Sequence, residues 1–528
     1  MSAAASPVDQ PVDRPAGMPT RGLSARDFRR VGEAGLGDGH NNYAHSMAWF
    51  KGRLYLGTTR SNMCMLRFQS AFAKLPLQVW PVDCPETMDG LYKLDRRSQI
   101  WAFDPASGQW EMAFRAPMVD GIDGRPVPRE IGYRSMSVYQ GAGDPEPALY
   151  VSAWAPGRAP GGLLLRSYDG QNFDPVTPYG IIDPPFSVTR SLTPFLGRMH
   201  FAPTAQRGTS GAQQNATDKP LIYGSDNPEA GDWQMVNPPG FDDPGNKGIF
   251  SLAVANDQLY AGTLNLDGLQ VWATDGTPAD GAEGPYPYRW RKVVDRGAGR
   301  GPLNQAVACM TAFNGALYVG TGIQGGGLDR VNNVGPAAAE ILRINPDDSY
   351  DVIVGDRDDE GRAPLSGLKA GFGNFFNGYM WSMGVHDGWL YCGTYDWSVT
   401  LRWAIYDKAP RMVRDLLDLV GTQSIVDNEG GADLWRTADG ENWMPVTRQG
   451  FDNAYNWGVR NLVTTPAGLF VGTANVFGPR VAVPGEAPAG AEDADSAPAP
   501  GWHYADNPRG GLEVWLGRGA PSDVGPHG

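Results

Sequence analysis

The sequence predicts an all-β fold, a seven-bladed β-propeller of four-stranded antiparallel blades. The first observation is a repeated phrase, Leu-Tyr-x-Gly-Thr, which begins at Leu54, Leu259, Leu317 and Leu390, and in the form LFVGT at Leu469. The second is composition: Gly (70) and Pro (44) exceed a fifth of the 528 residues, which argues against long helices, while 41% hydrophobic residues can fill a sizeable core. The third is an N-terminal phrase that matches the end of each repeat.

Each copy of the repeated phrase follows a short apolar segment that ends in a turn, as in MAWFKGRLYLGT and MTAFNGALYVGT. This is the pattern of strand, tight turn and strand. Two degenerate copies, LYVSA at Leu149 and MHFAP at Met199, complete a set of seven. A second hairpin follows, best seen in DLWRTADGENWMPVT from Asp433. Because one four-stranded unit cannot bury both of its faces, we expect the units to stack radially.

The N-terminal strand is expected to close the ring. The seventh unit ends early, because no fourth strand follows GGLEVWLG, whereas DFRRVGEAG from Asp27 matches the fourth-strand phrases WRKVVDRG and WMPVTRQG. We therefore predict a single propeller over 26–518, in which strand 27–34 completes blade 7 and leaves no open edge. The blades are expected to start near residues 45, 134, 190, 250, 308, 381 and 460. Residues 1–25 are expected to be a disordered tail, and 519–528 a second tail.

Charge and composition limit the classes of partner. The chain has 44 Lys and Arg against 58 Asp and Glu, a net charge of −14, which disfavours proteins that coat nucleic acid or a membrane. A signal-peptide core and a run of about 18 apolar residues are both missing, so we expect a soluble cytoplasmic protein, a monomer or weak homo-oligomer. The cysteines, Cys64, Cys84, Cys309 and Cys392, show no paired spacing, so neither a disulfide scaffold nor a structural zinc site is expected.

Long insertions fall in the loops between second and third strands, which share one face of a propeller. They are 59–98, 322–339, 395–432 and 474–510. Extra loops on one face are a common way for a repeat scaffold to gain a pocket. One or two short helices are predicted there, APRMVRDLLDLV from Ala409 and NMCMLRFQSAFAKL from Asn62, whereas 485–500 is of low complexity and expected to be disordered.

Alignment of the seven copies separates scaffold positions from individual ones. Six residues before the alignment point stand Asn41, Glu130, Phe186, Asn246, Asn304, Asn377 and Asn456. A recurring Asn is most simply a loop lock, its amide bonding the backbone of a turn.

Two residues before that point stand His45, Arg134, Arg190, Phe250, Ala308, Trp381 and Arg460. Blades 7, 1, 2 and 3 are ring neighbours, so we call Arg460, His45, Arg134 and Arg190 the arginine arc. With Trp381 and Phe250 on the other side, the arc is suited to a carboxylate, phosphate or sulfate group held against an aromatic wall. The alternative is that each arginine bridges blades through Glu130, Asp183 or Asp396.

Proton transfer is assigned to groups near the same mouth. His45, Tyr43, Tyr133 and Tyr379 are the candidate acids or bases, the tyrosines through an arginine that lowers their pKa. Asp396 joins the arginines, Trp381 and Phe250 as a candidate substrate-binding residue.

No cofactor is predicted. His40 and His45 share one loop but have no further matched metal ligands. DRDDEG, from Asp356, opens like a calcium loop, yet its twelfth position is Gly367 rather than Glu, which favours a solvated turn. Calcium therefore stays a weak alternative, and no metal ligand is assigned.

Two stretches, SYDGQNF at Ser167 and TADGENW at Thr437, resemble the Asp-box repeats of sialidase-like propellers, although that family usually separates Asp and Gly by one residue. This resemblance covers one hairpin per blade and implies a fold rather than an activity. A sialidase is disfavoured, since that family has six blades and its Phe-Arg-Ile-Pro signature is absent. The repeat type is also similar to the propeller portion of bacterial alkylating cyclases, but no catalytic motif matches residue by residue.

The expected function is that of a cytoplasmic enzyme of small-molecule metabolism, natural-product metabolism included. Its substrate is expected to be anionic and partly aromatic or apolar, bound at the top of the channel, with arginines stabilising charge and His45 or a tyrosine moving protons. Cyclase, alkyl-transfer or lyase-like chemistry is favoured over sialidase chemistry. The alternative is a non-catalytic propeller that binds a protein or glycan through its long loops.

Overall fold

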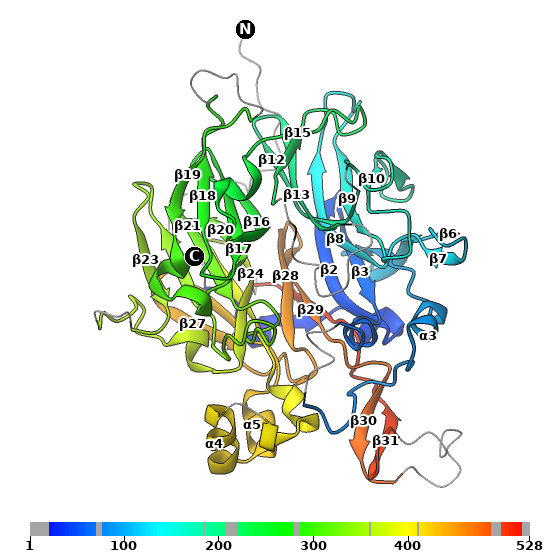
Figure 1. Cartoon of the computed structure of the whole chain (residues 1–528), viewed down its shortest axis with the longest axis vertical. Coiled ribbons are helices and arrows are strands. Elements are labelled where there is room, and N and C mark those ends of the chain that lie inside the picture. Colours follow the sequence, from blue (N-terminus) through cyan, green and yellow to red (C-terminus); the bar gives the residue numbers. More distant parts are fainter. Residues whose placement is uncertain are drawn as a thin grey trace, which may run out of the picture.

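The computed structural model describes residues 21–69, 76–183, 185–206, 217, 220–278, 286–357, 361–408, 411–486 and 498–519. These residues form mostly antiparallel β-sheets with few helices (Figure 1). The fold is all-β and propeller-like, as the sequence predicts at that level.

Antiparallel pairings link the described strands four at a time, and we name each set by its first strand. The β2 set is β2 (Asn41–Phe50), β3 (Arg53–Arg60), β4 (Gln99–Asp104) and β5 (Gln109–Arg115). The β8 set is β8 (Gly132–Tyr139), β9 (Ala148–Trp154), β10 (Leu163–Ser167) and β11 (Asp174–Pro175). The β12 set is β12 (Phe186–Phe195), β13 (Arg198–Gln206), β14 (Tyr223–Ser225) and β15 (Gln234–Met235). The β16 set is β16 (Asn246–Ala255), β17 (Gln258–Asn265), β18 (Val271–Thr274) and β19 (Arg291–Val294).

The remaining sets follow the same order. The β20 set is β20 (Ala306–Phe313), β21 (Ala316–Gly322), β22 (Ile341–Ile344) and β23 (Tyr350–Val354). The β24 set is β24 (Asn377–His386), β25 (Trp389–Asp396), β26 (Leu434–Thr437) and β27 (Trp443–Thr447). The β28 set is β28 (Gly458–Thr465), β29 (Gly468–Ala474), β32 (Val514–Gly517) and, from the other end of the chain, β1 (Phe28–Arg30).

The first strands contact one another in chain order, from β2 through β8, β12, β16, β20 and β24 to β28, and β28 contacts β2. A small polar residue near the start of several of these strands makes a hydrogen bond to the next one. Ser46 Oγ donates to the Tyr133 carbonyl (2.6 Å), Ser382 Oγ to Val459 (2.8 Å) and Asn461 Nδ2 to Ala44, while Leu192 N donates to Ser135 Oγ (3.0 Å) and Leu252 N to Ser191 Oγ (3.3 Å). These bonds form a polar seam around the inner strands.

The recurring asparagines lock loops, as predicted. Each donates Nδ2 to the carbonyl of a glycine six or seven residues earlier: Asn41 to Gly35, Asn246 to Gly240, Asn304 to Gly297, Asn377 to Gly371 and Asn456 to Gly450, at 2.8–3.0 Å. These glycines have φ of 57–66°, a region that side chains disfavour. The same amide groups also donate to a side chain at the start of a third strand or directly before it: Gln99, Gln270, Glu340, Asp433 and Glu513.

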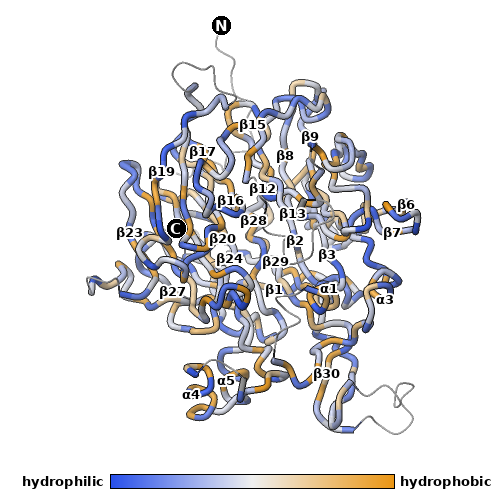
Figure 2. Tube along the Cα trace, in the orientation of Figure 1, coloured by the Kyte–Doolittle hydropathy of each residue, from blue (hydrophilic) through white to orange (hydrophobic). Residues whose placement is uncertain are grey.

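The insertions carry four helices: α1 (Asn62–Leu66), α3 (Met88–Lys93), α4 (Arg411–Val420) and α5 (Thr422–Glu429). They also carry a hairpin of β30 (Arg480–Pro484) and β31 (Trp502–Asp506). A second short hairpin, β6 (Met118–Asp120) and β7 (Pro126–Pro128), lies outside the insertions. The helix predicted from Ala409 is α4, although 409–410 lie outside the described residues. Figure 2 shows hydrophobic residues along α4 and α5. The second helix is shorter than predicted, since α1 ends at Leu66.

Several expectations fall wholly or partly outside the described residues: the tails at 1–20 and 520–528, residues 487–497 of the loop, and 358–360 of the calcium-like turn. Across the ranges that the structure does describe, no helix has the length and apolarity to cross a bilayer.

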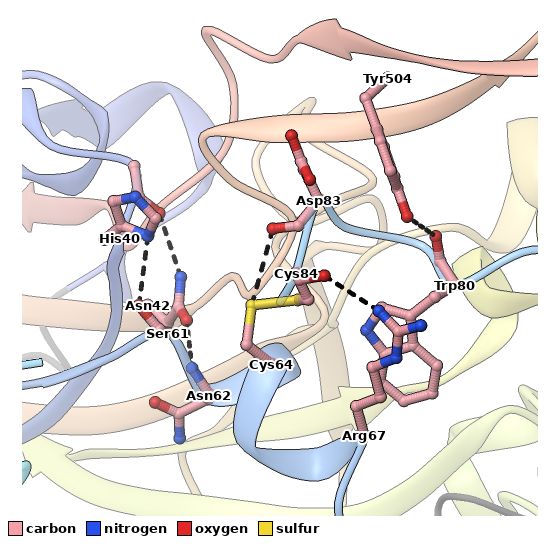
Figure 3. The surroundings of a disulfide bond; sticks show 11 residues. His40, Asn42, Ser61, Asn62, Cys64, Arg67, Trp80, Asp83, Cys84 and Tyr504 are labelled. Carbon is pink, nitrogen blue, oxygen red and sulfur yellow. Dashed lines mark hydrogen bonds between the residues drawn. A yellow bond between two sulfur atoms is a disulfide. The ribbon is translucent and has the colours of Figure 1, made fainter. Parts of the chain in front are cut away.

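The spacing of the cysteines gives no indication of a pair, yet the structure contains a disulfide. Cys64 of α1 and Cys84 form a disulfide with Cα atoms 5.2 Å apart (Figure 3). Twenty residues separate them in sequence, but the insertion folds back so that both lie beside the β2 set. Cys309 and Cys392 are free thiols.

Replacing Phe28 tests whether β1 is an integral strand. Phe28 is 7% exposed and packs on Phe451 at 5.5 Å between ring centroids, so Phe28→Ala should lower the free energy of unfolding by about 3–5 kcal/mol in a urea titration. The exposed neighbour Arg29 is the control, and Arg29→Ala should change it by less than about 0.5 kcal/mol. Equal effects would show that β1 does not pack as described.

Candidate functional site

The first strands carry β-bulges at the register that the alignment singled out. In the described strands the extra residue is His45, Arg134, Phe250, Ala308, Trp381 or Arg460, and in β12 the irregularity directly follows Arg190. A bulged residue leaves the ladder and its side chain is re-aimed. Because the bulged strands contact one another in sequence, their re-aimed side chains converge.

The guanidinium groups of the arginine arc lie close enough to repel one another. Burial and the neighbouring charge of Arg460 lower the pKa of Arg134 to about 9. Burial, Arg134 and Arg460 together hold the pKa of Arg190 well below its ordinary value. Arg134 of β8, Arg190 of β12 and Arg460 of β28 therefore lie within electrostatic range of one another.

Aromatic rings flank two of these cations. The Cζ atom of Arg190 lies 3.6 Å from the centroid of the Phe250 ring, and that of Arg460 lies 5.3 Å from the Trp381 ring. Tyr43 meets Trp381 edge to face at 5.8 Å. A guanidinium stacked on a ring keeps its N–H groups at the edge of the stack, where they can bind an anion.

His45 is 4% exposed and lies among the three arginines. Burial, then Arg460, Arg134 and Arg190, hold its pKa well below the ordinary value, so the imidazole is neutral at pH 7. Its Nδ1 has no hydrogen-bond partner among the described residues. A Cβ at Gly132 would lie 3.1 Å from Nδ1, so this glycine preserves the space beside the ring.

The tyrosines do not behave as the sequence analysis expects. Burial raises the pKa of Tyr43 and of Tyr379, and the lowering effect of Arg460 on the first and Arg190 on the second is smaller. The Tyr379 hydroxyl accepts hydrogen bonds from the backbone N–H groups of Gly325 (2.9 Å) and Gly326 (3.0 Å). Both tyrosines lie by the arc, but in their protonated form.

Tyr133 does not join the site. It is fully buried in the core between the β2 and β8 sets, and its hydroxyl lies 3.4 Å from Glu130. Burial and Glu130 raise its pKa, and none of the arc arginines acts on it. Tyr133 stays paired with Ala153 and packs in this core, whereas the bulge at Arg134 re-aims only the arginine side chain.

Asp396 is also a scaffold residue. It is fully buried and accepts hydrogen bonds from Asn374 Nδ2 (2.9 Å) and from the backbone N–H of Ser398 (2.8 Å). Glu130, another carboxylate considered as a bridge, pairs with Arg129. Asp396 is thus held by the loop after β25, and its assignment to substrate binding was wrong.

Sequence reasoning missed Cys309, which follows Ala308. Its Sγ donates to the Met380 carbonyl (3.2 Å), and burial raises its pKa to about 12 even though Arg460 lies near. The thiol is therefore protonated and contributes no charge to the site. The sequence holds no signal for this, since a lone Cys in a strand is ordinarily a packing residue.

Sequence reasoning also missed that three insertions form one unit. We call the described residues of the insertions after β3, β25 and β29 the cap. In Figure 1, α4, α5, β30 and β31 lie below the strands and α3 lies at the right. The segment 76–84 joins them: Gln78 N donates to the Trp403 carbonyl (2.8 Å) and Ala482 N to the Pro81 carbonyl (2.9 Å).

The cap borders the site. The Cys64–Cys84 disulfide anchors segment 76–84 to α1, whose Asn62 N donates to Asn42 Oδ1 (2.7 Å), next to Tyr43 (Figure 3). The apolar cluster of the cap contains Trp403 and Phe477, and Tyr43, Tyr379 and Trp381 pack against it. The aromatic side of the site is therefore shielded from water by the insertions.

Within the ranges described by the structure, no group of three or more His, Cys, Asp or Glu side chains is placed to hold a metal ion. The site itself presents cations and neutral donors, which suits an anion.

Comparisons with known proteins add little about activity. No family model matches the chain, and no curated protein matches it. Among solved structures it is similar to a puromycin-hydrolysing peptidase of Mycobacterium tuberculosis (12% identity, 84% of this chain, 61% of that chain, TM-score 0.34) and an acylaminoacyl peptidase of Pyrococcus horikoshii (8%, 83%, 50%, 0.36). It is also similar to a glycoside hydrolase family 43 endo-arabinanase from Bacillus licheniformis (14%, 49%, 88%, 0.27).

The chain spans less than two thirds of the length of these two peptidases. At TM-scores below 0.5 these likenesses carry no argument, so the description of the fold rests on the strand pairings.

The depressed pKa of His45 predicts a pH dependence of stability. As pH falls below about 6.5, the unfolded state binds a proton at His45 and the native state does not. The free energy of unfolding therefore falls on acidification, by at most about 1.4 kcal/mol per pH unit from this residue. His45→Gln should therefore lose less stability than the parent between pH 6.5 and pH 5 in urea titrations. Parallel curves would contradict the buried, neutral imidazole.

Proposed function

We propose that the chain is a seven-bladed β-propeller whose central channel binds the anionic group of a small-molecule substrate. The blade number is supported by the four-strand sets, by the contact of β28 with β2, and by the pairing of β1 with β32, where Phe28 lies opposite Gly517. In this arrangement β1 completes the last blade and no sheet edge is left at the join.

The observation that carries the proposal is the mutual repulsion of Arg134, Arg190 and Arg460. Burial lowers the pKa of all three arginines, and neighbouring arginines lower it further for Arg134 and Arg190. In a protein of net charge −14, the fold places these three arginines at the same register of β8, β12 and β28, which neighbour one another or β2. A bound anion relieves both costs, since charge-assisted hydrogen bonds to guanidinium groups are strong.

The chemistry available at this centre is charge stabilisation with proton transfer. His45 is neutral and can take a proton from a bound substrate, while the guanidinium groups stabilise negative charge that develops beside it. The rings of Trp381 and Tyr43 offer an apolar surface for the rest of the substrate. We therefore favour an enzyme, in which His45 is the base and the arginines bind the substrate.

A non-catalytic binding protein is the second candidate, and the cap is the feature that favours it. Helix α4 leaves Leu419 84% exposed and Met412 54% exposed, so the cap presents apolar side chains that a protein partner can cover. The disulfide weighs against the cytoplasmic location expected from the sequence, because structural disulfides persist mainly in oxidising compartments.

The arginines are tested by replacing each of Arg134, Arg190 and Arg460 with Met, which keeps much of the apolar stem. Each variant should fold, and should lose about 1.5–3 kcal/mol of binding to phosphate, sulfate or benzoate for each charged hydrogen bond removed. The measurement is a thermal melt with and without each anion. Arg411→Met is the matched control, because Arg411 is 87% exposed on α4.

If the arginines bridge blades instead, the same variants leave buried carboxylates without a partner. The free energy of unfolding then falls by about 3–5 kcal/mol even when no anion is added. Early-melting variants, together with a parent that no anion stabilises, would refute the site. The His45→Gln variant separates binding from catalysis. If it binds anions as the parent does but turns over no substrate, His45 is assigned to proton transfer.

A further inference from the structure

We propose that the Cys64–Cys84 disulfide is a redox latch of the cap. In the oxidised form it links segment 76–84 to α1, and a dithiol reductant breaks this link and frees the cap to move away from the aromatic side of the site. Release of the cap does not depend on the proposed anion site, whereas its effect on ligand exchange rests on that site.

On one side of the disulfide, α1 is held by the strands. Ser61 N donates to the His40 carbonyl (3.0 Å), and Asn62 N donates to Asn42 Oδ1 (2.7 Å), so the start of the helix is bonded to the start of β2 (Figure 3). Cys64 therefore stays with the strands when the disulfide is broken.

On the other side, segment 76–84 is bonded to the insertions after β25 and β29. Ile405 N donates to the Pro76 carbonyl (2.6 Å), and Arg480 of β30 pairs with Asp83 (2.8 Å). These bonds add to those from Gln78 and Ala482 described above. The segment is therefore part of the same unit as these two insertions, and the disulfide fixes that unit to α1.

The two sulfur atoms lie where their release reaches the site. Cys64 and Cys84 both belong to the apolar cluster against which Tyr43, Tyr379 and Trp381 pack. Breaking the bond removes a covalent restraint from this cluster, and a part of a protein can open locally while the rest stays folded. The ladder between β8 and β9 contains no cap residue, so we expect it to stay intact.

The redox step is thiol–disulfide exchange. A thiolate of the dithiol attacks Sγ of Cys84, because Cys84 is 8% exposed and Cys64 is 2% exposed, and Cys64 leaves as a thiolate that takes up a proton. The second thiol of the reductant then displaces Cys84 from the mixed disulfide. Two electrons pass to the protein, which gains two thiols, and the reductant becomes a disulfide.

The test uses the whole chain in three forms: the oxidised parent, the parent in millimolar dithiothreitol, and the double variant Cys64→Ser/Cys84→Ser. Reduction is measured first, by alkylating the folded protein and counting the modified cysteines after denaturing it in excess alkylating agent of a second mass. Two thiols are expected in the oxidised parent, Cys309 and Cys392, and four after reduction.

Opening of the cap is then measured by hydrogen exchange. Reduction should raise exchange of the Gln78, Ile405 and Ala482 amides by about tenfold or more, because each donates a hydrogen bond within the cap. Amides of β9 are the control and should not change. The double variant should match the reduced parent with and without dithiothreitol; if it does not fold, the reduced parent carries the comparison.

Ligand exchange is followed with 4-fluorobenzoate by fluorine NMR, and we expect it to enter and leave the reduced parent at least about fivefold faster than the oxidised parent. A cap that opens while neither form binds the probe supports the latch and refutes the anion site. A cap that opens without any change in the exchange of the bound probe shows that the latch does not control the site, and the proposal fails.

The remaining results also decide. If the folded protein keeps two thiols in dithiothreitol, the reductant does not reach the bond and the latch is wrong. If four thiols form and the cap stays protected, the disulfide is a structural link only. If β9 exchanges faster together with the cap, the bond stabilises the whole protein rather than the cap, which also contradicts the proposal.

Discussion

The β-bulge in each first strand is the constraint on which the rest of the structure depends. An antiparallel ladder without the extra residue would direct the side chains at this register into the packed faces between neighbouring sets. The bulge turns one side chain out of the ladder and leaves the next residue facing the adjacent first strand. His45 with Ser46, and Trp381 with Ser382, show both results: the first residue enters the arc region, and the second bonds the neighbouring backbone.

This arrangement separates stability from function. The asparagine locks and the cluster between the β2 and β8 sets hold the strands through residues outside the bulged positions, whereas the bulged Phe250 packs with Leu264 and Ala306. The bulged positions therefore vary without loss of the fold, from Ala308 to Trp381. A cationic arc is one of many side-chain sets that such a scaffold can carry.

Much of the fold follows from the repeat, because the alternation of strands and turns fixes the register of each copy. The alignment of the copies also groups the residues of the arc, because the bulge recurs at the same position and leaves the copies aligned with one another. Tyr133 was misplaced because proximity in sequence to Arg134 was taken for proximity in space, although the bulge in β8 re-aims only the arginine side chain. Asp396 was misplaced because its partners, Asn374 and Ser398, lie in loops whose paths the strand pattern does not determine.

The cap is harder to predict from the sequence than the strands are. Its pieces come from insertions after β3, β25 and β29, and they meet only because the first strands of the β24, β28 and β2 sets are neighbours. Neither the pairing of Cys64 with Cys84 nor the bond from Ala482 to the Pro81 carbonyl follows from local spacing. Such contacts depend on the packing of these first strands against one another, which places the insertions side by side, and Tyr43, Tyr379 and Trp381 pack against their apolar cluster.

Holding three guanidinium groups together lowers the stability of the empty protein, and the scaffold must offset this cost. Burial strengthens the repulsion, since charges interact more strongly away from water. The stacking of Arg190 on Phe250 and of Arg460 on Trp381 compensates in part, because a ring face attracts a cation without neutralising it. Aromatic support therefore holds Arg190 and Arg460 in place without adding a negative charge, which suits the anion site that we propose.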